Sequence, residues 1–289
     1  MNEVIECRLA AVRVHPIKSC AGIAVDEALL IETGLEFDRA WMVVDEAGVM
    51  LTQREWPRLA LVQARLRHAD LLLRAPGMLA LHLMLDAVEA PTTARVWDDE
   101  VKAYDMGDLA AQWFTDFLAP ASGRRLRLAR FDPEHKRLSD PKWTKDIAAE
   151  NAFSDGFPLL VANQASLDDL NARLAARGQP PVGMERFRPN LVIEGLPAWD
   201  EDHLHEIRFD TDEGPIVLRL VKPCARCPIP NVDPATGERG TEPGDTLAGF
   251  RADARVKGGI TFGMNAVIVE GIERVLRPGL RGQAGWNFD

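Results

Sequence analysis

Two cysteines, Cys224 and Cys227, stand at CxxC spacing in the stretch "VKPCARCPIP" and could do chemistry. A thiolate is a nucleophile and also a soft ligand for metal ions. Lys222 and Arg226 lie beside the pair in sequence and favour the thiolate form if their side chains come close. The alternation of apolar residues in "PIVLRLVKP" predicts a strand, so we expect both cysteines in the loop that follows it.

Several kinds of site use this spacing. A zinc site needs further ligands, and His203 and His205 are separated by one residue, which is not the usual zinc spacing. A thioredoxin-type redox pair opens a helix, and Pro228 makes a helix start there unfavourable. A soft metal ligand and two incidental loop cysteines remain as alternatives.

Cationic and polar residues recur near the ends of predicted strands. Lysine, hydroxyl and free backbone N–H groups suit a phosphate, and a guanidinium offers it two parallel hydrogen bonds. Taken singly, each segment is equally typical of a solvated turn or a surface ion pair. Together, in a protein of net charge -10, they predict an anionic ligand. These residues are Lys18 and Ser19 in "HPIKSCAG", Asp38 and Arg39 in "GLEFDRAWMV", and Arg186, Arg188 and Asn190 in "MERFRPNLVIEG".

Composition narrows the class of protein. The chain has 289 residues, which suits one large or two medium domains. Its net charge argues against general nucleic-acid binding, which needs clustered positive charge. We find no GxGxxG, Walker, GxSxG or HExxH motif. The N-terminus does not read as a signal peptide and no stretch is apolar enough to span a membrane, so we expect a cytosolic protein with reduced cysteines.

Period-two patterns dominate the first hundred residues and predict hairpins that turn at residues 45–48 and 75–77, with a third in "ARVWDDEVKAYD". The spacing of Leu109, Trp113 and Phe117 predicts an amphipathic helix that ends before Pro120. A polar run over residues 132–150 predicts an irregular connection or a domain joint.

A second helix is predicted in "SLDDLNARLAARG", with Ser166 as its N-cap and Gly178 at its end. This helix is preceded by a buried strand, and the strand is preceded by the turn "SDGFP", residues 154–158. Strands outnumber helices and do not alternate regularly with them. The pattern therefore favours a strand-rich α+β, barrel-like architecture over a doubly wound sheet.

The stretch from His15 to Val62 resembles the N-terminal β-barrel module of MOSC-domain proteins. The stretches "FRPNLVIEG", "VKPCARCPIPNVDPATGERGTEPGDTLAGFR" and "GITFGMNAVIVEG" resemble the MOSC domain itself. The chain is thus similar to the amidoxime reducing component family and its bacterial counterparts. The resemblance implies an N-terminal β-barrel-like domain in residues 1–122 and a MOSC β-barrel domain with a few helices in residues 123–289.

The resemblance also implies the molybdenum cofactor, a pyranopterin dithiolene with a terminal phosphate, to which one protein cysteine adds a sulfur ligand for molybdenum. By motif position this ligand is Cys227, and Cys224 is the alternative. Asp155 is implied near the metal as a candidate proton donor. The cofactor-binding residues that the motifs imply are Lys18, Ser19, Arg39, Phe157, Arg188, Asn190 and Arg226.

The activity that the resemblance implies is a two-electron reduction of N-hydroxylated compounds. A non-catalytic cofactor carrier or a sulfur-handling protein is the alternative. The chain carries no CxxxxCxxC run of a plant-type ferredoxin module, so we expect electrons from a separate donor, such as a ferredoxin-type iron–sulfur protein and its reductase. Lacking a presequence or membrane anchor, the chain is expected to be a bacterial cytosolic protein.

Overall fold

The structure is a computed structural model, and it describes residues 4–119 and 123–286. Within these residues seven strands close into a barrel, because the first strand of the series, β12, also pairs with the last, β17. β12 and β13 run parallel, and the other neighbours in the barrel are antiparallel. In their order around the barrel, the strands are β12 (Leu159–Asn163), β13 (Leu191–Glu194), β1 (Val4–Val14), β19 (Arg281–Trp286), β14 (Leu204–Thr211), β15 (Gly214–Ala225) and β17 (Gly259–Glu270).

Short strands and helices surround the barrel. β2 (Ile23–Val25) pairs with β1, and β16 (Ala252–Asp253) pairs with β17. A small separate sheet consists of β18 (Val275–Leu276), β3 (Ala28–Ile31) and β4 (Gly34–Leu35). The helices of this part are α2 (Pro141–Thr144), α3 (Gln164–Ala176) and α4 (Gly244–Ala248). In the part of the chain that the structure describes, no helix is long and apolar enough to cross a membrane.

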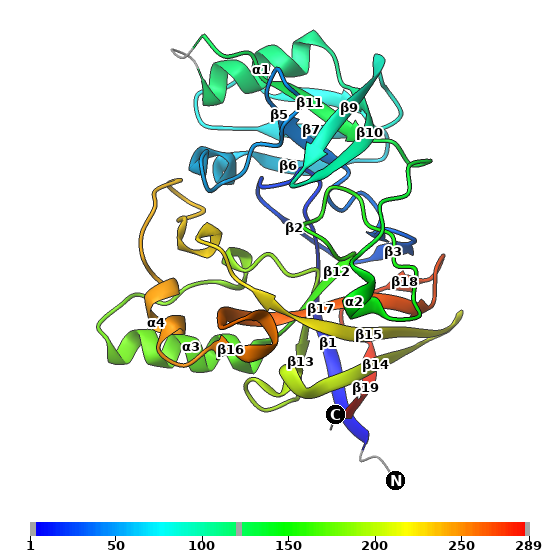
Figure 1. The fold of residues 1–289 in the computed structure, drawn as a ribbon, viewed down its shortest axis with the longest axis vertical. Coiled ribbons are helices and arrows are strands. Elements are labelled where there is room, and N and C mark those ends of the chain that lie inside the picture. Colours follow the sequence, from blue (N-terminus) through cyan, green and yellow to red (C-terminus); the bar gives the residue numbers. More distant parts are fainter. Residues whose placement is uncertain (1–3, 120–122, 287–289) are drawn as a thin grey trace.

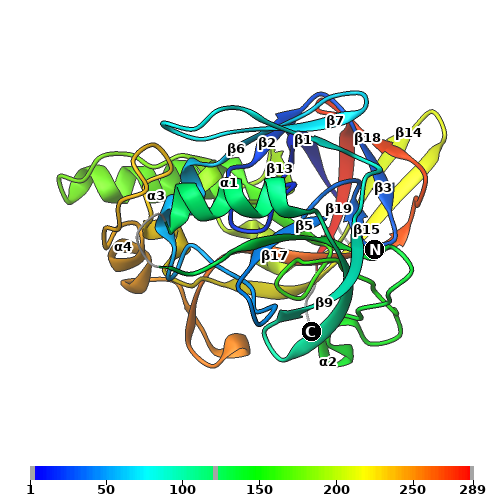
Figure 2. The same ribbon diagram turned by 90° about the horizontal axis from the view of Figure 1, so that it is seen from above.

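Two more sheets lie above the barrel in Figure 1 and belong to the N-terminal half. One has the order β5 (Trp41–Val44), β11 (Arg127–Phe131), β10 (Asp99–Asp105) and β9 (Ala90–Val96). The other has the order β6 (Gln63–Leu66), β7 (Asp70–Arg74) and β8 (Leu81–Met84). α1 (Asp108–Leu118) lies across these strands in the view from above (Figure 2).

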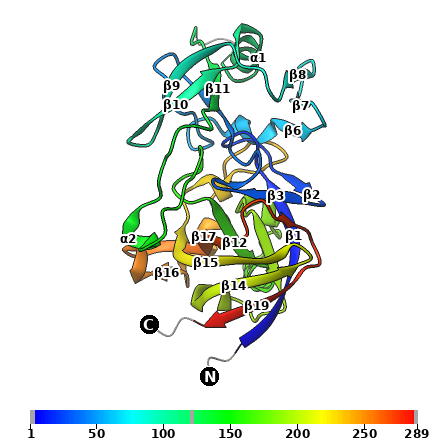
Figure 3. The same cartoon turned by 90° about the vertical axis from the view of Figure 1, so that its right-hand side faces the viewer.

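The first strand of the chain is a barrel strand and joins the two halves. β1 pairs with β13 through Arg8 and Glu194 and with β19 through Cys7 and Gly282. Both ends of the described chain therefore lie at the same end of the molecule, far from α1 (Figure 3). The expected division between residues 122 and 123 stays a prediction, and residues 120–122 lie outside the described residues.

β5 is a strand of four apolar residues that is buried on both faces. Trp41 and Val43 pack into one core together with Phe114 of α1. Met42 and Val44 point to the opposite face and pack into a second core with Phe153. Because both faces are covered by core residues, the strand is apolar throughout.

The predicted strand-rich α+β class with a β-barrel is confirmed. The first predicted helix is also present as α1, but Leu109 is 71% exposed. The buried face is centred between Trp113 and Phe114, which places Leu109 at its edge. Pro120 lies outside the described residues.

The prediction of Ser166 as an N-cap is wrong. The N-cap of α3 lies three residues earlier, at Asn163, whose side chain accepts a hydrogen bond from the Ala165 N–H at 3.2 Å. Ser166 lies fully buried in the first turn, where its hydroxyl serves a contact outside the helix. Gly178 does follow the helix with the left-handed φ of 70° that a C-terminal glycine permits.

Candidate functional site

A cleft is lined from both halves of the molecule, by segments on either side of β5 and by loops at one end of the barrel. All the metal- and cofactor-site residues that the family motifs imply line this cleft, although they lie up to 209 positions apart in the sequence (from 18 to 227). This placement brings the residues together without assigning their roles. They are Lys18, Ser19, Arg39, Asp155, Phe157, Arg188, Asn190, Arg226 and Cys227, and Cys224 lines the cleft with them.

Arg186 does not share this cleft, although strand alternation placed it on one face with Arg188 and Asn190. Residues 184–186 form a short 3-10 helix, so the alternation of a strand does not apply there. Arg186 instead donates to the carbonyl oxygens of Pro230 and Val232, each at 3.2 Å, and so holds the loop after β15.

Lys18 lies buried in the segment after β1, and its ammonium group points to the loop before β12. Its Nζ donates to the Phe153 carbonyl oxygen at 2.8 Å and to Asp155 Oδ1 at 2.5 Å. Burial lowers the pKa of Lys18, and the positive charges of Arg137 and Arg39 lower it further, against the opposing effect of Asp155. The proton on this lysine is therefore held less firmly than on a solvated one.

Asp155 is the partner of Lys18 and faces the cleft. Partial loss of hydration in the cleft would by itself raise its pKa, but the nearby charges of Lys18, Arg54 and Arg39 outweigh that effect and hold the pKa below its ordinary value, while the side chain stays 64% exposed. Asp155 is therefore ionised at neutral pH in the absence of a ligand.

Arg39 links the N-terminal half to the barrel. Its guanidinium is paired with the buried Asp38, and it donates to Asn190 Oδ1 at 3.1 Å and to the Arg188 carbonyl oxygen at 3.0 Å. Burial by itself would raise the pKa of Asp38, but the charge of Arg39 and contacts with His15 bring it down to about 2. Asp38 thus stays ionised and holds Arg39 in a fixed orientation.

Asn190 is 1% exposed, and its side chain hydrogen-bonds to the backbone of two barrel strands. Its Oδ1 accepts from the Leu160 N–H at 3.1 Å as well as from Arg39, and its Nδ2 donates to the Arg13 carbonyl oxygen at 3.3 Å. The Oδ1 is therefore occupied by protein donors, and only one Nδ2 hydrogen is left for a ligand. The main contribution of Asn190 in this structure is to place Arg39.

Three of these side chains leave the backbone from left-handed conformations. The φ angles of Ser19, Arg39 and Arg188 are 66°, 48° and 58°. Non-glycine residues rarely adopt this region, and such residues cluster at functional sites, where the surrounding structure enforces them. Arg188 is held further by a hydrogen bond to the Cys20 carbonyl oxygen, and burial with the nearby Arg39 lowers its pKa to about 10. It remains charged at neutral pH.

The two cysteines of the cleft have different surroundings. Arg226 lies between them in sequence; its Nη1 donates to Cys224 Sγ at 2.9 Å and its Nη2 to the Phe187 carbonyl oxygen at 2.9 Å. Cys227 Sγ makes no hydrogen bond to any residue that the structure describes. Both thiols are partly exposed, whereas Cys7 and Cys20 are buried and pack in the cores.

Comparison with known proteins places this architecture. Residues 6–121 match the MOSC N-terminal beta barrel domain and residues 148–280 match the MOSC domain. The chain is 37% identical to mitochondrial amidoxime reducing component 2 of Rattus norvegicus, over 86% of this chain and 74% of that protein. It is 36% identical to mitochondrial amidoxime-reducing component 1 of Mus musculus (84% of this chain, 71% of that protein) and 35% identical to component 2 of Homo sapiens (84% and 72%).

The chain belongs to the MOSC-domain family. The family resemblance expected from the sequence motifs is thereby confirmed. The MOSC domain supplies the barrel end of the cleft, and the N-terminal domain match contains Lys18, Ser19, Arg39 and Arg54.

The charge of this MOSC cleft indicates what it can hold. Among the described residues that line it, the cations are Lys18, Arg39, Arg54, Arg188 and Arg226, against the single carboxylate of Asp155. Lys18 and Arg39 have carboxylate partners, whereas the other three arginines make no ion pair within the described residues. The Nε of Arg226 is also buried without a hydrogen-bond partner there. Such a cleft suits an anionic ligand.

The loop that carries Asp155 is fixed by a buried arginine. Arg137 Nη1 donates to Asn151 Oδ1 at 2.6 Å and to the carbonyl oxygens of Ala152 and Ser154 at 2.9 and 2.8 Å. The predicted irregular connection is therefore ordered by its own polar contacts, and it can present Asp155 to the cleft at a defined position.

Sequence reasoning missed Arg54, Gln53 and Thr52, which follow β5. Thr52 and Arg54 line the cleft, and Gln53 Nε2 donates to the Ser19 carbonyl oxygen at 2.6 Å. Their signal is the polar stretch "TQRE" after the apolar residues 49–51, a pattern that is also typical of an ordinary turn.

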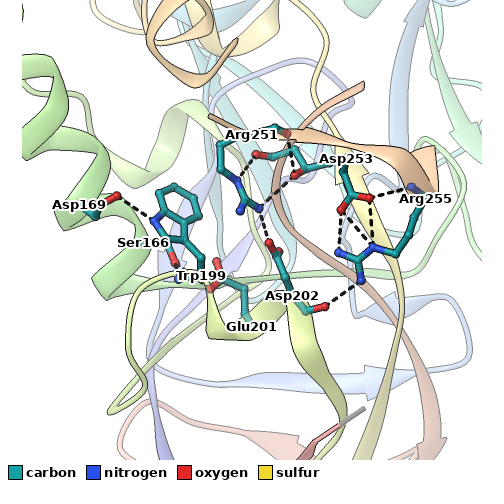
Figure 4. Close-up of polar contacts among 9 residues, drawn as sticks. Ser166, Asp169, Trp199, Glu201, Asp202, Arg251, Asp253 and Arg255 are labelled. Atoms are coloured by element: carbon teal, nitrogen blue, oxygen red, sulfur yellow. Dashed lines mark hydrogen bonds and ion pairs between the residues drawn. The ribbon is translucent and has the colours of Figure 1, made fainter. Parts of the chain in front are cut away.

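A second polar cluster, separate from the cleft, lies between α3, residues 199–203 and residues 251–255 around β16 (Figure 4). The fully buried Glu201 accepts from Ser166 Oγ at 2.7 Å, while Asp202 pairs with Arg251. Burial raises the pKa of Glu201 to about 7, and Asp202 adds to that effect. Among residues 4–119 and 123–286, no group of three or more His, Cys, Asp or Glu side chains is arranged to hold a metal ion.

Proposed function

We propose that this MOSC-domain protein binds the molybdenum cofactor in the cleft and reduces N-hydroxylated compounds. The observation that carries the proposal is the meeting, in one cleft, of arginines without ion-pair partners and a partly exposed thiol without a hydrogen bond. The names of the relatives, which are amidoxime reducing components, support the same reaction class.

The residues of the cleft fit the parts of this cofactor. Its terminal phosphate is dianionic near neutral pH, and Arg188 and Arg226 offer charged donors that no carboxylate occupies. The buried Nε of Arg226 gains a partner when an acceptor enters the cleft, which removes the cost of an unsatisfied donor. We assign Lys18, Ser19, Arg39, Phe157 and Asn190 to the remaining wall of the cofactor site.

Cys227 is the proposed molybdenum ligand, and the hydrogen bonds of the cleft support this choice. Arg226 occupies the sulfur of Cys224, so that thiol is placed to hold the guanidinium. The sulfur of Cys227 keeps its lone pairs free, as a metal ligand requires. When bound, the cofactor supplies the two-electron redox chemistry at its metal.

The protein must also deliver protons, because reduction of R–NH–OH to R–NH2 and water consumes two electrons and two protons. Asp155 was expected as the donor, but ionised it has no proton of its own to give. We therefore assign one of the two protons to Lys18 Nζ, from which it can pass through Asp155 Oδ1 at 2.5 Å to the substrate, while the second proton comes from solvent. Substrate binding next to the carboxylate would favour this transfer by excluding water.

We further propose that a separate protein donates the electrons, one at a time. The relatives' description as components of an amidoxime-reducing activity supports a multi-protein arrangement. A ferredoxin-type donor, a cytosolic location and a bacterial origin stay predictions from the sequence.

Metal analysis tests the proposal. The chain is purified from a host that makes the cofactor, and molybdenum per chain is measured for the wild type and for Cys227→Ala and Cys224→Ala. We expect about one molybdenum in the wild type and in Cys224→Ala, and a large loss in Cys227→Ala. Molybdenum-free wild-type protein would refute cofactor binding.

Turnover separates the reductase from a carrier. Loaded wild-type protein is assayed for reduction of benzamidoxime with an artificial electron donor. We expect turnover in the wild type and none in Cys227→Ala. Fully loaded protein without turnover would instead favour the carrier alternative.

A further inference from the structure

A second pocket opens beside the cofactor cleft, in the N-terminal half. It has a volume of about 410 Å³. Its lining combines two tryptophans, Trp56 and Trp97, and the apolar side chains of Val49, Met50, Leu51 and Leu126 with the charged residues Asp45, Arg54, Glu55 and Arg124. Thr52 and Arg54 line both this pocket and the cleft. The two spaces are therefore neighbours that share one wall, and a molecule that reacts in the cleft can extend into the pocket.

Trp97 occupies a position that does not suit a tryptophan. It is the first residue of the two-residue turn between β9 and β10, its φ is 56°, and it is 42% exposed. Glycine is the preferred residue at a first turn position with positive φ, and a bulky side chain there is a strained exception. Burial does not explain the tryptophan, because much of its ring faces solvent. Strain of this kind is typical of ligand-binding positions.

Arg54 connects Trp97 to the cleft. Its guanidinium carbon lies 4.3 Å from the centre of the Trp97 ring, which is a stacking distance. The segment that carries it is tied to the cofactor cleft by the hydrogen bond of Gln53 to Ser19 and is braced by that of Thr52 Oγ1 to Glu55 Oε2 at 2.7 Å. The guanidinium thus covers one face of the indole, and this stacked pair forms a wall next to the reacting space.

We propose that the pocket lined by Trp56 and Trp97 binds the planar aromatic ring of the substrate, so that Trp97 and Arg54 select aromatic over aliphatic N-hydroxylated compounds. This inference rests on the proposed reductase function. Both an indole ring and a guanidinium plane stack on aromatic rings, and neither offers a comparable contact to a small aliphatic group. The N-hydroxylated group of such a substrate extends past Arg54 into the cleft, toward Asp155.

The test measures equilibrium binding of benzamidoxime and of acetamidoxime to the full chain by isothermal titration calorimetry. The variant is Trp97→Gly, since glycine suits the turn and the fold is expected to tolerate it. Leu79→Ala removes another exposed apolar side chain of the same half, outside both pockets, and serves as the control. Molybdenum content and thermal unfolding of each sample are measured in parallel.

We expect Trp97→Gly to weaken benzamidoxime binding roughly fivefold to tenfold, with acetamidoxime binding unchanged, and Leu79→Ala to alter neither. The melting temperature of Trp97→Gly should stay equal or rise, because the strain is relieved. The inference is overturned if the wild type does not prefer benzamidoxime, if Trp97→Gly keeps the wild-type preference, or if its melting temperature falls clearly. If wild-type protein from a host that makes the cofactor contains no molybdenum and still prefers benzamidoxime, the reductase proposal fails and the aromatic pocket stands.

Discussion

Glu201 provides a sharp test of the electrostatics of the fold, because it lies outside the cleft and its titration is independent of any cofactor. It is fully buried, one carboxyl oxygen accepts from Ser166, and the other has no hydrogen-bond partner among the described residues. Burial raises its pKa from the ordinary 4.5 to about 7. In the folded protein the Glu201 carboxyl group is therefore protonated and neutral at mildly acidic pH.

The sign of the effect on stability follows from the linkage of protons to folding. Below pH 4.5 Glu201 is protonated in both the folded and the unfolded chain, and its contribution to stability is fully present. Between pH 4.5 and 7 the unfolded chain releases the proton while the folded chain keeps it, so the free energy of unfolding falls. The rise from 4.5 to about 7 corresponds to roughly 3 kcal/mol lost by pH 8.

Glu201→Gln removes this titration and keeps an acceptor for Ser166. The free energy of unfolding is measured by urea denaturation at several pH values from 4.5 to 8, and the difference between variant and wild type is plotted. We expect the variant to gain roughly 3 kcal/mol relative to the wild type across this range, and the exposed Glu213→Gln to gain almost nothing. If the difference in the free energy of unfolding between variant and wild type changes by less than about 1 kcal/mol from pH 4.5 to 8, Glu201 does not have a raised pKa.

Local patterns predicted the secondary structure where neighbours in sequence decide it. The hairpin of β7 and β8 follows from two leucine-rich segments on either side of a Pro-Gly turn, and α1 follows from the spacing of Trp113 and Phe117. The N-cap of α3 was missed, because the chain turns from β12 directly into the helix at Asn163. Ser166 looks like a cap in sequence, but a buried carboxylate takes its hydroxyl.

Strand pairing in the barrel could not be predicted in this way. Alternation shows which side chains of β1 share a face, but it does not identify the partner strands. β1 pairs with β13 through Arg8 and Glu194, 186 residues apart, and β19 adds the last strand of the chain. Such pairings depend on the packing of the whole core.

The cleft residues were predicted from family motifs, but their backbone conformations and contacts could not be predicted from the sequence. Nothing in a serine or an arginine indicates a left-handed backbone, yet Ser19, Arg39 and Arg188 all adopt one. Arg54 gave only the weak signal of the polar stretch "TQRE", which is typical of any surface turn. Its relevance comes from Trp97, which lies on a different hairpin and meets Arg54 only in the folded protein.

Two further variants test how the cleft is held, both through the free energy of unfolding in urea. Asp38→Asn removes the buried charge that pairs with Arg39, so we expect a loss of roughly 3 kcal/mol at pH 7, and a loss below about 0.5 kcal/mol would contradict the buried pair. In the wild type this contribution is present above pH 3.8 and is lost as the pH falls through about 2. Gly22→Ala places a Cβ 2.6 Å from the ring of the buried His15, so the ring must shift. We expect this substitution to cost about 1–3 kcal/mol. The control is Gly156→Ala, whose added Cβ has no other atom within 4 Å, so it should change the free energy of unfolding by less than about 0.5 kcal/mol. Equal effects of the two substitutions would show that His15 does not pack against Gly22.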